Sequence, residues 1–301
     1  MQLLKKIVTV VVVVVIFFFL IRNLISNWQN IPFTSLYFNV ISLAVSFLFL
    51  FVNFLIFVEG WRAIIRALGG TITFKNSFWI MSSSQIAKYV PGGIWFALGR
   101  VYLSKLEKLK GEIAAVSVII ETGLTFLVGI VLLFLSFGFS EQRTFANFYF
   151  AIPIFFMFLI VLYPPLLNRL LNVAMRVLKR PAITLRISYI RLLRLSFYFF
   201  GLWLAQIIGF YFLINSMYPI ALSKLFNLAA AYTLSWMVGF IVIFAPAGLG
   251  VREGTMSLLL SPILPMPLAI AISFIARVWI TVFEIAIFFI GLVVKRATRR
   301  G

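Results

Sequence analysis

Three residue types that enzymes often use in their active sites are missing from this chain of 301 residues, which has no cysteine, no histidine and no aspartate. Without cysteine the chain has no disulfide and no thiolate nucleophile. Without histidine it lacks the usual general base near neutral pH and the commonest zinc ligand. All seven acidic residues are glutamate. We therefore expect no cofactor and no metal, and the composition disfavours an enzyme.

Charged residues of either sign are also scarce, at 11% of the chain, whereas 63% of residues are hydrophobic and the mean hydropathy is +1.14. A soluble domain carries about 25% charged residues because its surface faces water. The composition therefore predicts an all-α polytopic membrane protein. The net charge of +19 indicates basic cytoplasmic loops and anionic lipid headgroups rather than nucleic acid.

The apolar runs predict about six transmembrane helices. These cover residues 7–26, 38–58, 113–138, 145–167, 195–217 and 268–294. The first is expected to be a retained signal-anchor helix, because no small-residue cleavage site follows it.

Two further apolar stretches are interrupted by proline and glycine, and each is expected to form a re-entrant helical hairpin. The first covers residues 74–103 with its break at Pro91-Gly92-Gly93, and the second covers residues 225–260 with its break at 246–250. The return arm of the first has roughly ten residues, about 15 Å of helix, which is too short for a hydrocarbon core of about 30 Å.

The distribution of lysine and arginine predicts that both termini lie on the cytoplasmic side of the membrane. The membrane is expected to be the inner membrane of the cell. This orientation requires that the first hairpin enters from the cytoplasm and the second from outside. The most basic stretch, residues 169–194, is interleaved with aliphatic residues. It is expected to be an interfacial amphipathic helix, with a plain basic loop as the alternative.

A weak internal repeat divides the single membrane domain, residues 1–301, into halves of about 1–140 and 141–301. Pro91 and Gly93 in the first half match Pro246 and Gly248 in the second. Each half has an odd number of spans, so the halves are predicted to be inverted relative to each other. Inverted repeats with broken helices are typical of transporters.

The residues expected to bind substrate lie at and after the two breaks, where free backbone amides and cations together suit a phosphate. They are Gln85, Lys88, Pro91, Gly92, Gly93, Arg100, Gly248, Gly250, Arg252 and Glu253. For the charged residues of this set, a purely structural role stays open. Lys88 would instead reach an interface, Arg100 would mark the cytoplasmic end of its arm, and Arg252 with Glu253 would form a structural pair.

Three charged residues within the predicted spans are candidates for gating or coupling, because ions at membrane depth are costly. Glu121 and Arg277 occupy matching positions of the repeat, which suggests a buried ion pair that acts as a gate or as a structural clamp. Glu284 lies two turns beyond Arg277 on roughly the same helix face and is a candidate for proton coupling.

Several motifs together resemble a known family. They are Lys88-Tyr-Val-Pro-Gly-Gly-Ile-Trp-Phe-Ala-Leu-Gly-Arg100, Glu121, Pro246-Ala-Gly-Leu-Gly-Val-Arg-Glu-Gly254, Ala276-Arg277 and Glu284. The chain resembles the flippase-like family typified by the transmembrane region of lysylphosphatidylglycerol synthases, and looks like a stand-alone member without the synthase domain. The resemblance implies lipid translocation between leaflets rather than aminoacyl transfer, with the charged motif residues lining or gating the pathway.

The expected function is therefore translocation of an anionic or polar lipid, either a phospholipid or a polyprenyl-phosphate-type lipid. No nucleotide-binding motif is present, so either protons or downhill flow would drive it. Two alternatives stay open: a membrane enzyme of lipid-phosphate or lipid-linked sugar metabolism, and an accessory subunit of such an enzyme. Each of these three functions is compatible with a homo-oligomer or with a lipid-modifying enzyme as a partner.

Overall fold

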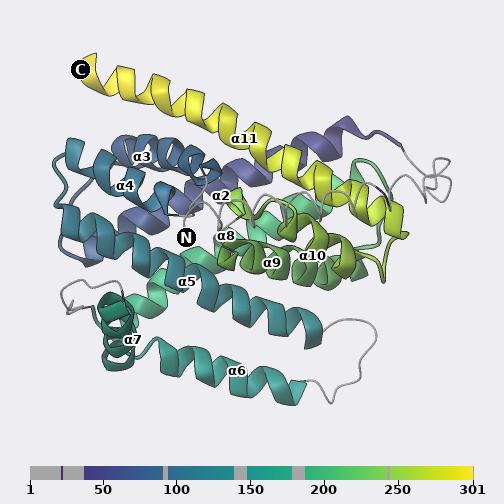
Figure 1. Cartoon of the computed structure of the whole chain (residues 1–301), viewed down its shortest axis with the longest axis horizontal. Helices are drawn as coiled ribbons and strands as arrows, with labels where there is room; N and C mark the ends of the chain where they lie inside the picture. Colours follow the sequence, from purple (N-terminus) through teal and green to yellow (C-terminus); the bar gives the residue numbers. More distant parts are fainter. Residues whose placement is uncertain are drawn as a thin grey trace, which may run out of the picture.

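The computed structural model describes residue 22 and residues 37–90, 94–138, 148–177, 187–242 and 245–300. In this part of the chain every regular element is a helix (Figure 1). The predicted helix over residues 7–26 and the predicted tip residues Pro91, Gly92 and Gly93 lie outside the described residues.

Four of the described helices are long and apolar enough to cross a membrane: α2 (Val40–Ala67), α5 (Gly111–Gly138), α8 (Tyr189–Asn215) and α11 (Met266–Arg300). A helix of 28 residues such as α2 is about 42 Å long, more than a core of about 30 Å requires. The all-helical membrane class predicted from composition is therefore confirmed. The total of six spans, the re-entrant hairpins and the orientation stay predictions.

Three predicted boundaries were wrong, and two of them lie between residues 145 and 195. The helix predicted over residues 145–167 is divided into α6 (Phe148–Val161) and α7 (Pro164–Val177). Pro164 begins the second helix because proline suits the first helical position, where its missing N–H is not needed. Helix α8 starts at Tyr189, so the amphipathic helix expected within residues 169–194 corresponds only in part to α7.

The third misplaced boundary is the end of α2, which was predicted near Val58. The helix continues for more than two turns through Glu59, Arg62 and Arg66. Glu59 accepts a hydrogen bond of 2.8 Å from Arg62 and also pairs with Arg66. These pairs at helical spacing stabilise the polar side of turns whose other side is buried through Trp61, Ile64 and Ile65.

Both interrupted stretches form pairs of short helices that pack against each other. In the first, α3 (Phe74–Ile86) and the 3-10 turn η3 (Ala87–Tyr89) precede α4 (Trp95–Leu106). In the second, the 3-10 turn η5 (Leu222–Lys224) leads into α9 (Leu225–Ile241), and the turn η6 (Pro246–Gly248) precedes α10 (Val251–Leu260).

The break in the second hairpin depends on glycine. Gly248 has a φ of +74° and Gly250 a φ of +82°, in the left-handed region that glycine adopts at little cost. A Cβ atom at Gly248 would lie 2.7 Å from the backbone of Gly239 in α9. Glycine is therefore required at position 248 both for the turn and for the close approach of the two arms.

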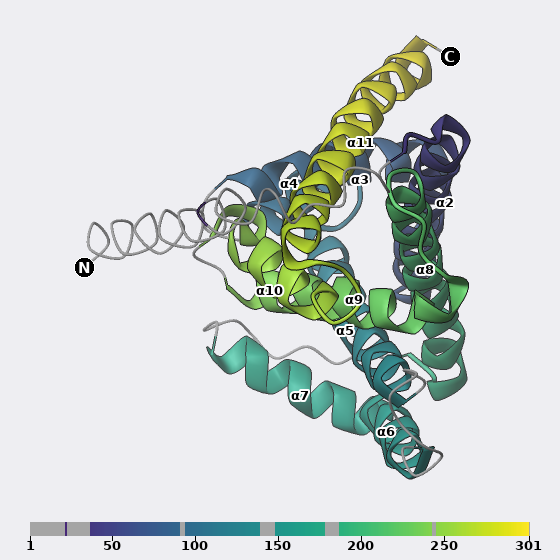
Figure 2. The ribbon, with the colours of Figure 1, turned by 90° about the vertical axis from the view of Figure 1, so that its right-hand side faces the viewer.

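The helices of the two halves interlock rather than pack as separate bundles. Helix α2 lies along α8, the first hairpin packs through α3 against α11, and the second packs through α9 against α5 (Figures 1 and 2). Helix α6 lies along α5, and α7 packs on α6 at the periphery. Each hairpin is therefore held by the long helix that follows the other hairpin.

Buried tryptophans join the long helices at three points. Trp61 donates to Ser117 Oγ at 2.9 Å, Trp203 to the backbone carbonyl of Thr125 at 3.0 Å, and Trp279 to Ser46 Oγ at 3.1 Å. These indole N–H groups find partners although they are buried, as the interior requires. They stabilise the contacts α2–α5, α8–α5 and α11–α2.

Candidate functional site

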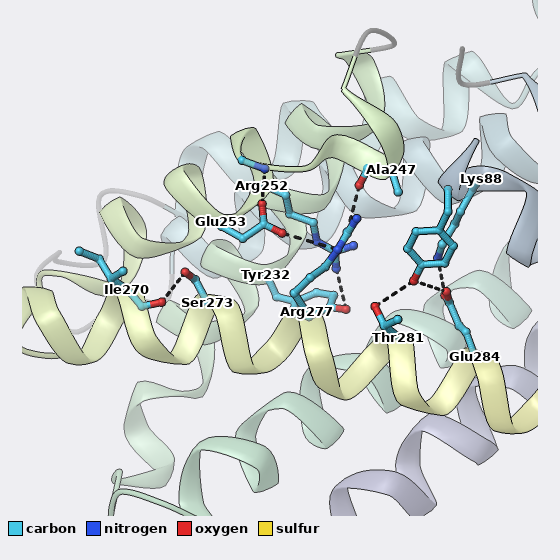
Figure 3. A network of polar contacts seen from close by, with 12 residues as sticks. Lys88, Tyr232, Ala247, Arg252, Glu253, Ile270, Ser273, Arg277, Thr281 and Glu284 are labelled. Atoms are coloured by element: carbon cyan, nitrogen blue, oxygen red, sulfur yellow. Dashed lines mark hydrogen bonds and ion pairs between the residues drawn. The ribbon is translucent and has the colours of Figure 1, made fainter. Parts of the chain in front are cut away.

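The tips of the two hairpins meet, because η3 contacts η6. Arg277 of α11 lies at this junction and touches both tips (Figure 3). Its Nη1 atom donates a hydrogen bond of 3.0 Å to the carbonyl of Ala247 in η6. Its guanidinium lies 5.7 Å from the ring centre of Tyr89 in η3. One arginine thus connects two segments that lie far apart in the sequence.

Helix α11 presents a polar face to the hairpins. Ser273, Arg277, Thr281 and Glu284 project from the same side of the helix (Figure 3), as their spacing of three or four residues requires. Glu284 forms an ion pair with Lys88 and accepts a hydrogen bond of 2.8 Å from the Tyr89 hydroxyl. The first tip is therefore tied to α11 by two contacts with one carboxylate.

The second tip is tied to α11 through the beginning of α10. Glu253 Oε2 accepts a hydrogen bond of 2.6 Å from the N–H of Gly250, and Glu253 Oε1 lies 3.6 Å from Arg277 Nε. A carboxylate at the amino end of a helix is stabilised by the free N–H groups there. Glu253 therefore closes this helix end and also compensates one arginine.

Arg252 points away from Glu253, as expected for neighbours on a helix. Its Nη2 atom donates a hydrogen bond of 2.8 Å to the hydroxyl of Tyr232 on α9, and its guanidinium lies 5.2 Å from the centre of the same ring. Arg252 is only 8% exposed. Among the described residues it pairs with no carboxylate, in contrast to Arg100 and Arg277.

A small cavity between α10 and α11 lies beside these groups and has room for about one water molecule. Its lining consists of Arg252, Glu253, Met256, Ser273, Ala276 and Arg277. Glu253 Oε1 and Arg277 Nη2 are buried without a hydrogen-bond partner among the described residues. Buried polar atoms are normally satisfied, whereas the ion pair of Glu253 and Arg277 leaves one acceptor and one donor without a hydrogen bond beside this cavity, within the described residues.

The sequence also matches a known protein family. The profile described as "Lysylphosphatidylglycerol synthase TM region" matches residues 6–287. The chain belongs to this family. Membership makes it a multi-pass membrane protein related to lipid metabolism, and it confirms the resemblance seen in the sequence motifs. A search of curated proteins found no match.

A second charged centre is separate from the first and lies between α4 and α5. Arg100 is 0% exposed. Its Nη1 donates to Glu121 Oε2, and its Nε donates to Ser84 Oγ at 3.2 Å. Three aromatic rings surround the guanidinium, those of Phe57, Trp61 and Phe96. Arg100 was predicted to face substrate, but here it is enclosed and paired, and it does not line the cavity between α10 and α11.

The predicted ion pair between Glu121 and Arg277 is wrong. Glu121 pairs with Arg100, and Arg277 pairs with Glu253. In each half the return arm of the hairpin pairs with the long helix that follows it, with the signs of the charges exchanged. Glu121 and Arg277 thus hold equivalent places in the two halves without touching each other, because each pairs with the return arm that precedes its own helix.

The remaining predicted residues have simpler settings. Gln85 is half-buried on α3, and its carbonyl accepts a hydrogen bond from the N–H of Ala87 at the end of that helix. Gly248 and Gly250 shape the second break. Sequence reasoning missed Tyr89 and Tyr232, the phenols that contact Glu284 and Arg252. Tyr89 follows Lys88 within the motif and was open to notice, whereas nothing in the sequence marks Tyr232.

Proposed function

We propose that this protein moves a lipid with an anionic or polar headgroup between the two leaflets of a membrane. The observation that carries the proposal is Arg252, a nearly buried cation whose partner among the described residues is the neutral hydroxyl of Tyr232. Ionic residues at membrane depth are costly and are usually retained for function. An uncompensated arginine beside a cavity suits a ligand that brings the missing negative charge.

The arrangement of the hairpins supports a pathway at their tips. Helices α4 and α10 have 12 and 10 residues, which correspond to about 18 and 15 Å and do not reach across a core of about 30 Å. We propose that both hairpins are re-entrant and that their meeting point lies inside the membrane. The headgroup would pass there while the acyl chains stay in lipid.

An inverted repeat would provide the motion. The interlocked packing, α3 on α11 and α9 on α5, is the exchange that a pseudo-two-fold axis generates. Each tip is tied to α11 by a carboxylate–cation contact, Lys88 with Glu284 and Glu253 with Arg277. In this proposal the two ties open in alternation, so that the site faces one leaflet and then the other.

The glutamates of the site are candidates for coupling rather than catalysis. Glu121 is engaged with Arg100 in a separate centre, so Glu121, Glu253 and Glu284 do not converge on one pocket. This distribution supports a transporter over an enzyme. Protonation of Glu253 or Glu284 would release a tie, and downhill flow of the lipid is the alternative source of energy. We place the protein in the inner membrane of the cell.

A leaflet assay tests the proposal. The purified chain is placed in liposomes with fluorescent phosphatidylglycerol, and a membrane-impermeant quencher reports how much label reaches the outer leaflet. We expect wild type to move the lipid and Arg252→Gln to slow it about tenfold or more, as loss of a buried charge contact does.

Arg191→Gln is the matched control, because Arg191 is exposed on α8 and the same charge is lost there. Equal rates for the two variants would contradict a role for the site. No movement by the wild-type protein of phosphatidylglycerol or of a polyprenyl-phosphate lipid would favour an accessory subunit instead.

A further inference from the structure

We infer that the site at the hairpin tips takes a headgroup with a single negative charge, that of one phosphodiester, and with a hydroxyl group beside it. The inference rests on the proposed function and narrows its substrate to one charge class. It is carried by the balance of charges at the two hairpin tips and by two polar atoms beside the cavity that make no hydrogen bond within the described residues.

The charge balance follows from five side chains. Lys88, Arg252 and Arg277 are positive, and Glu253 and Glu284 are negative, which leaves one positive charge in excess. Residues 91–93 and 243–244, which lie outside the described part of the chain, are uncharged in the sequence. The Arg100–Glu121 pair is neutral as a whole and does not change the balance.

One added negative charge would therefore make the site neutral. In a medium of low dielectric a net charge of either sign is penalised much more than in water. A diphosphate, with at least two negative charges, would bring its extra charge close to Glu253 and Glu284. A zwitterionic headgroup would bring an ammonium group beside Arg252 and Arg277, so it would not relieve the excess.

The cavity adds a requirement for hydrogen bonds. Arg277 Nη2 is a buried donor without a partner, and Glu253 Oε1 is a buried acceptor without one, within the described residues. Both residues line the same cavity. A phosphate oxygen satisfies the first, and a hydroxyl hydrogen of the headgroup satisfies the second. An unsatisfied buried polar atom is costly, so a headgroup that offers both groups is favoured over one with phosphate alone.

Two lipid classes share this chemistry. Phosphatidylglycerol has one phosphodiester charge and a glycerol with free hydroxyls, and a polyprenyl-phosphate-linked hexose has one phosphodiester charge and sugar hydroxyls. Their acyl or prenyl chains would lie outside the charged site, so the site itself recognises what they have in common. An experiment with both lipids distinguishes the two sources.

Competition binding to the full-length protein in detergent tests the inference without transport. A fluorescent phosphatidylglycerol is displaced by unlabelled phosphatidylglycerol, a polyprenyl-phosphate hexose, phosphatidylethanolamine or a polyprenyl diphosphate. We expect at least one singly charged lipid to compete at a concentration about tenfold lower than the zwitterion and the diphosphate. The stronger of the two names the source. Equal or stronger competition by the zwitterion or the diphosphate would overturn the inference.

Charge variants test the same point from the protein side. Glu284→Gln raises the excess at the site to two positive charges and should shift the preference toward the diphosphate by about tenfold. Glu253→Gln should do the same and also weaken binding of hydroxyl-bearing headgroups, which gives a second route if one variant fails to fold. Glu112→Gln is the matched control, because Glu112 is exposed at the start of α5. The same preference in all three variants would refute the inference.

The two proposals fail in different ways. Selective binding of a singly charged lipid without movement across the bilayer would keep the charge class and refute translocation. Movement of lipids regardless of headgroup charge would keep translocation and refute the charge class.

Discussion

Single residues show how this protein tolerates ions at membrane depth. Arg100 and Glu121 form a pair enclosed by aromatic rings, and the guanidinium is also bonded to Ser84. A buried pair loses much when one partner is removed, because the other charge is left without compensation. The pair therefore stabilises the first hairpin against α5.

Glu121→Gln should lower the free energy of unfolding by about 3–5 kcal/mol, because Arg100 remains buried with its charge. Glu59→Gln is the control, since Glu59 pairs with Arg62 and Arg66 nearer to solvent, where such pairs contribute about 0–1 kcal/mol. Denaturation in detergent micelles measures both. Equal losses would show that burial of the Arg100 pair has no energetic consequence.

Gly248→Ala adds a single Cβ atom at the second break and tests whether glycine is required there. The new atom would meet the backbone of Gly239 at 2.7 Å, in addition to the cost of the left-handed φ. Gly69→Ala has the same φ cost, at +79°, but nothing within 4 Å of the new atom.

The backbone cost of each is about 1–2 kcal/mol. We expect the Gly248 variant to lose clearly more thermal stability than the Gly69 variant. Similar losses would mean that the close approach of the two arms is unimportant.

At the scale of elements, the hairpins were predictable and their partners were not. Proline and glycine at positions 246–250 located the second break, and the start of α9 at Leu225 and the end of α10 at Leu260 agree with the sequence-based boundaries. The end of α2 was missed because Glu59 and its two arginines resemble a loop when read as a run of charges. Their spacing, rather than their polarity, decides the structure.

Pairing between elements is the part that sequence alone did not reveal. The repeat suggested that Glu121 and Arg277 meet, because they hold matching positions. A repeat fixes which positions are equivalent but not which of them touch, and each of these two residues pairs with the return arm that precedes its own helix. Tyr232 could not be selected either, since an aromatic residue in an apolar helix carries no distinguishing pattern.

The contacts between the first tip and α11 lead to a prediction about hydrogen exchange in η3. Glu284→Gln removes the charge that holds Lys88 and weakens the bond from Tyr89. Backbone amides of η3 should then exchange with deuterium faster. Glu107→Gln breaks an ion pair with Lys295 farther along α11 and serves as the control. Unchanged exchange in η3 of the Glu284 variant would contradict the tie.

At the scale of the whole molecule, the account depends on two halves with opposite orientation. The loop that joins α4 to α5 and the loop that joins α10 to α11 are equivalent in the repeat and should lie on opposite sides of the membrane. Lys110 and Ser261 are exposed in these loops.

Because the chain has no cysteine, Lys110→Cys and Ser261→Cys give clean single labels. An impermeant maleimide applied outside intact cells should label the second variant only. Labelling of both variants from one side would contradict the inverted arrangement.

The central claim is that a lipid headgroup passes between the two hairpin tips. The most direct measurement links η3 to η6 in a Tyr89→Cys, Ala247→Cys protein with a short reducible cross-linker, and follows lipid movement in the same liposomes before linking, after linking and after reduction. A Phe49→Cys, Phe212→Cys protein is the control, because these rings stack between α2 and α8, away from the tips. The account predicts that movement stops with the tips linked, returns on reduction, and continues when α2 and α8 are linked. Undiminished movement with the tips linked would contradict it.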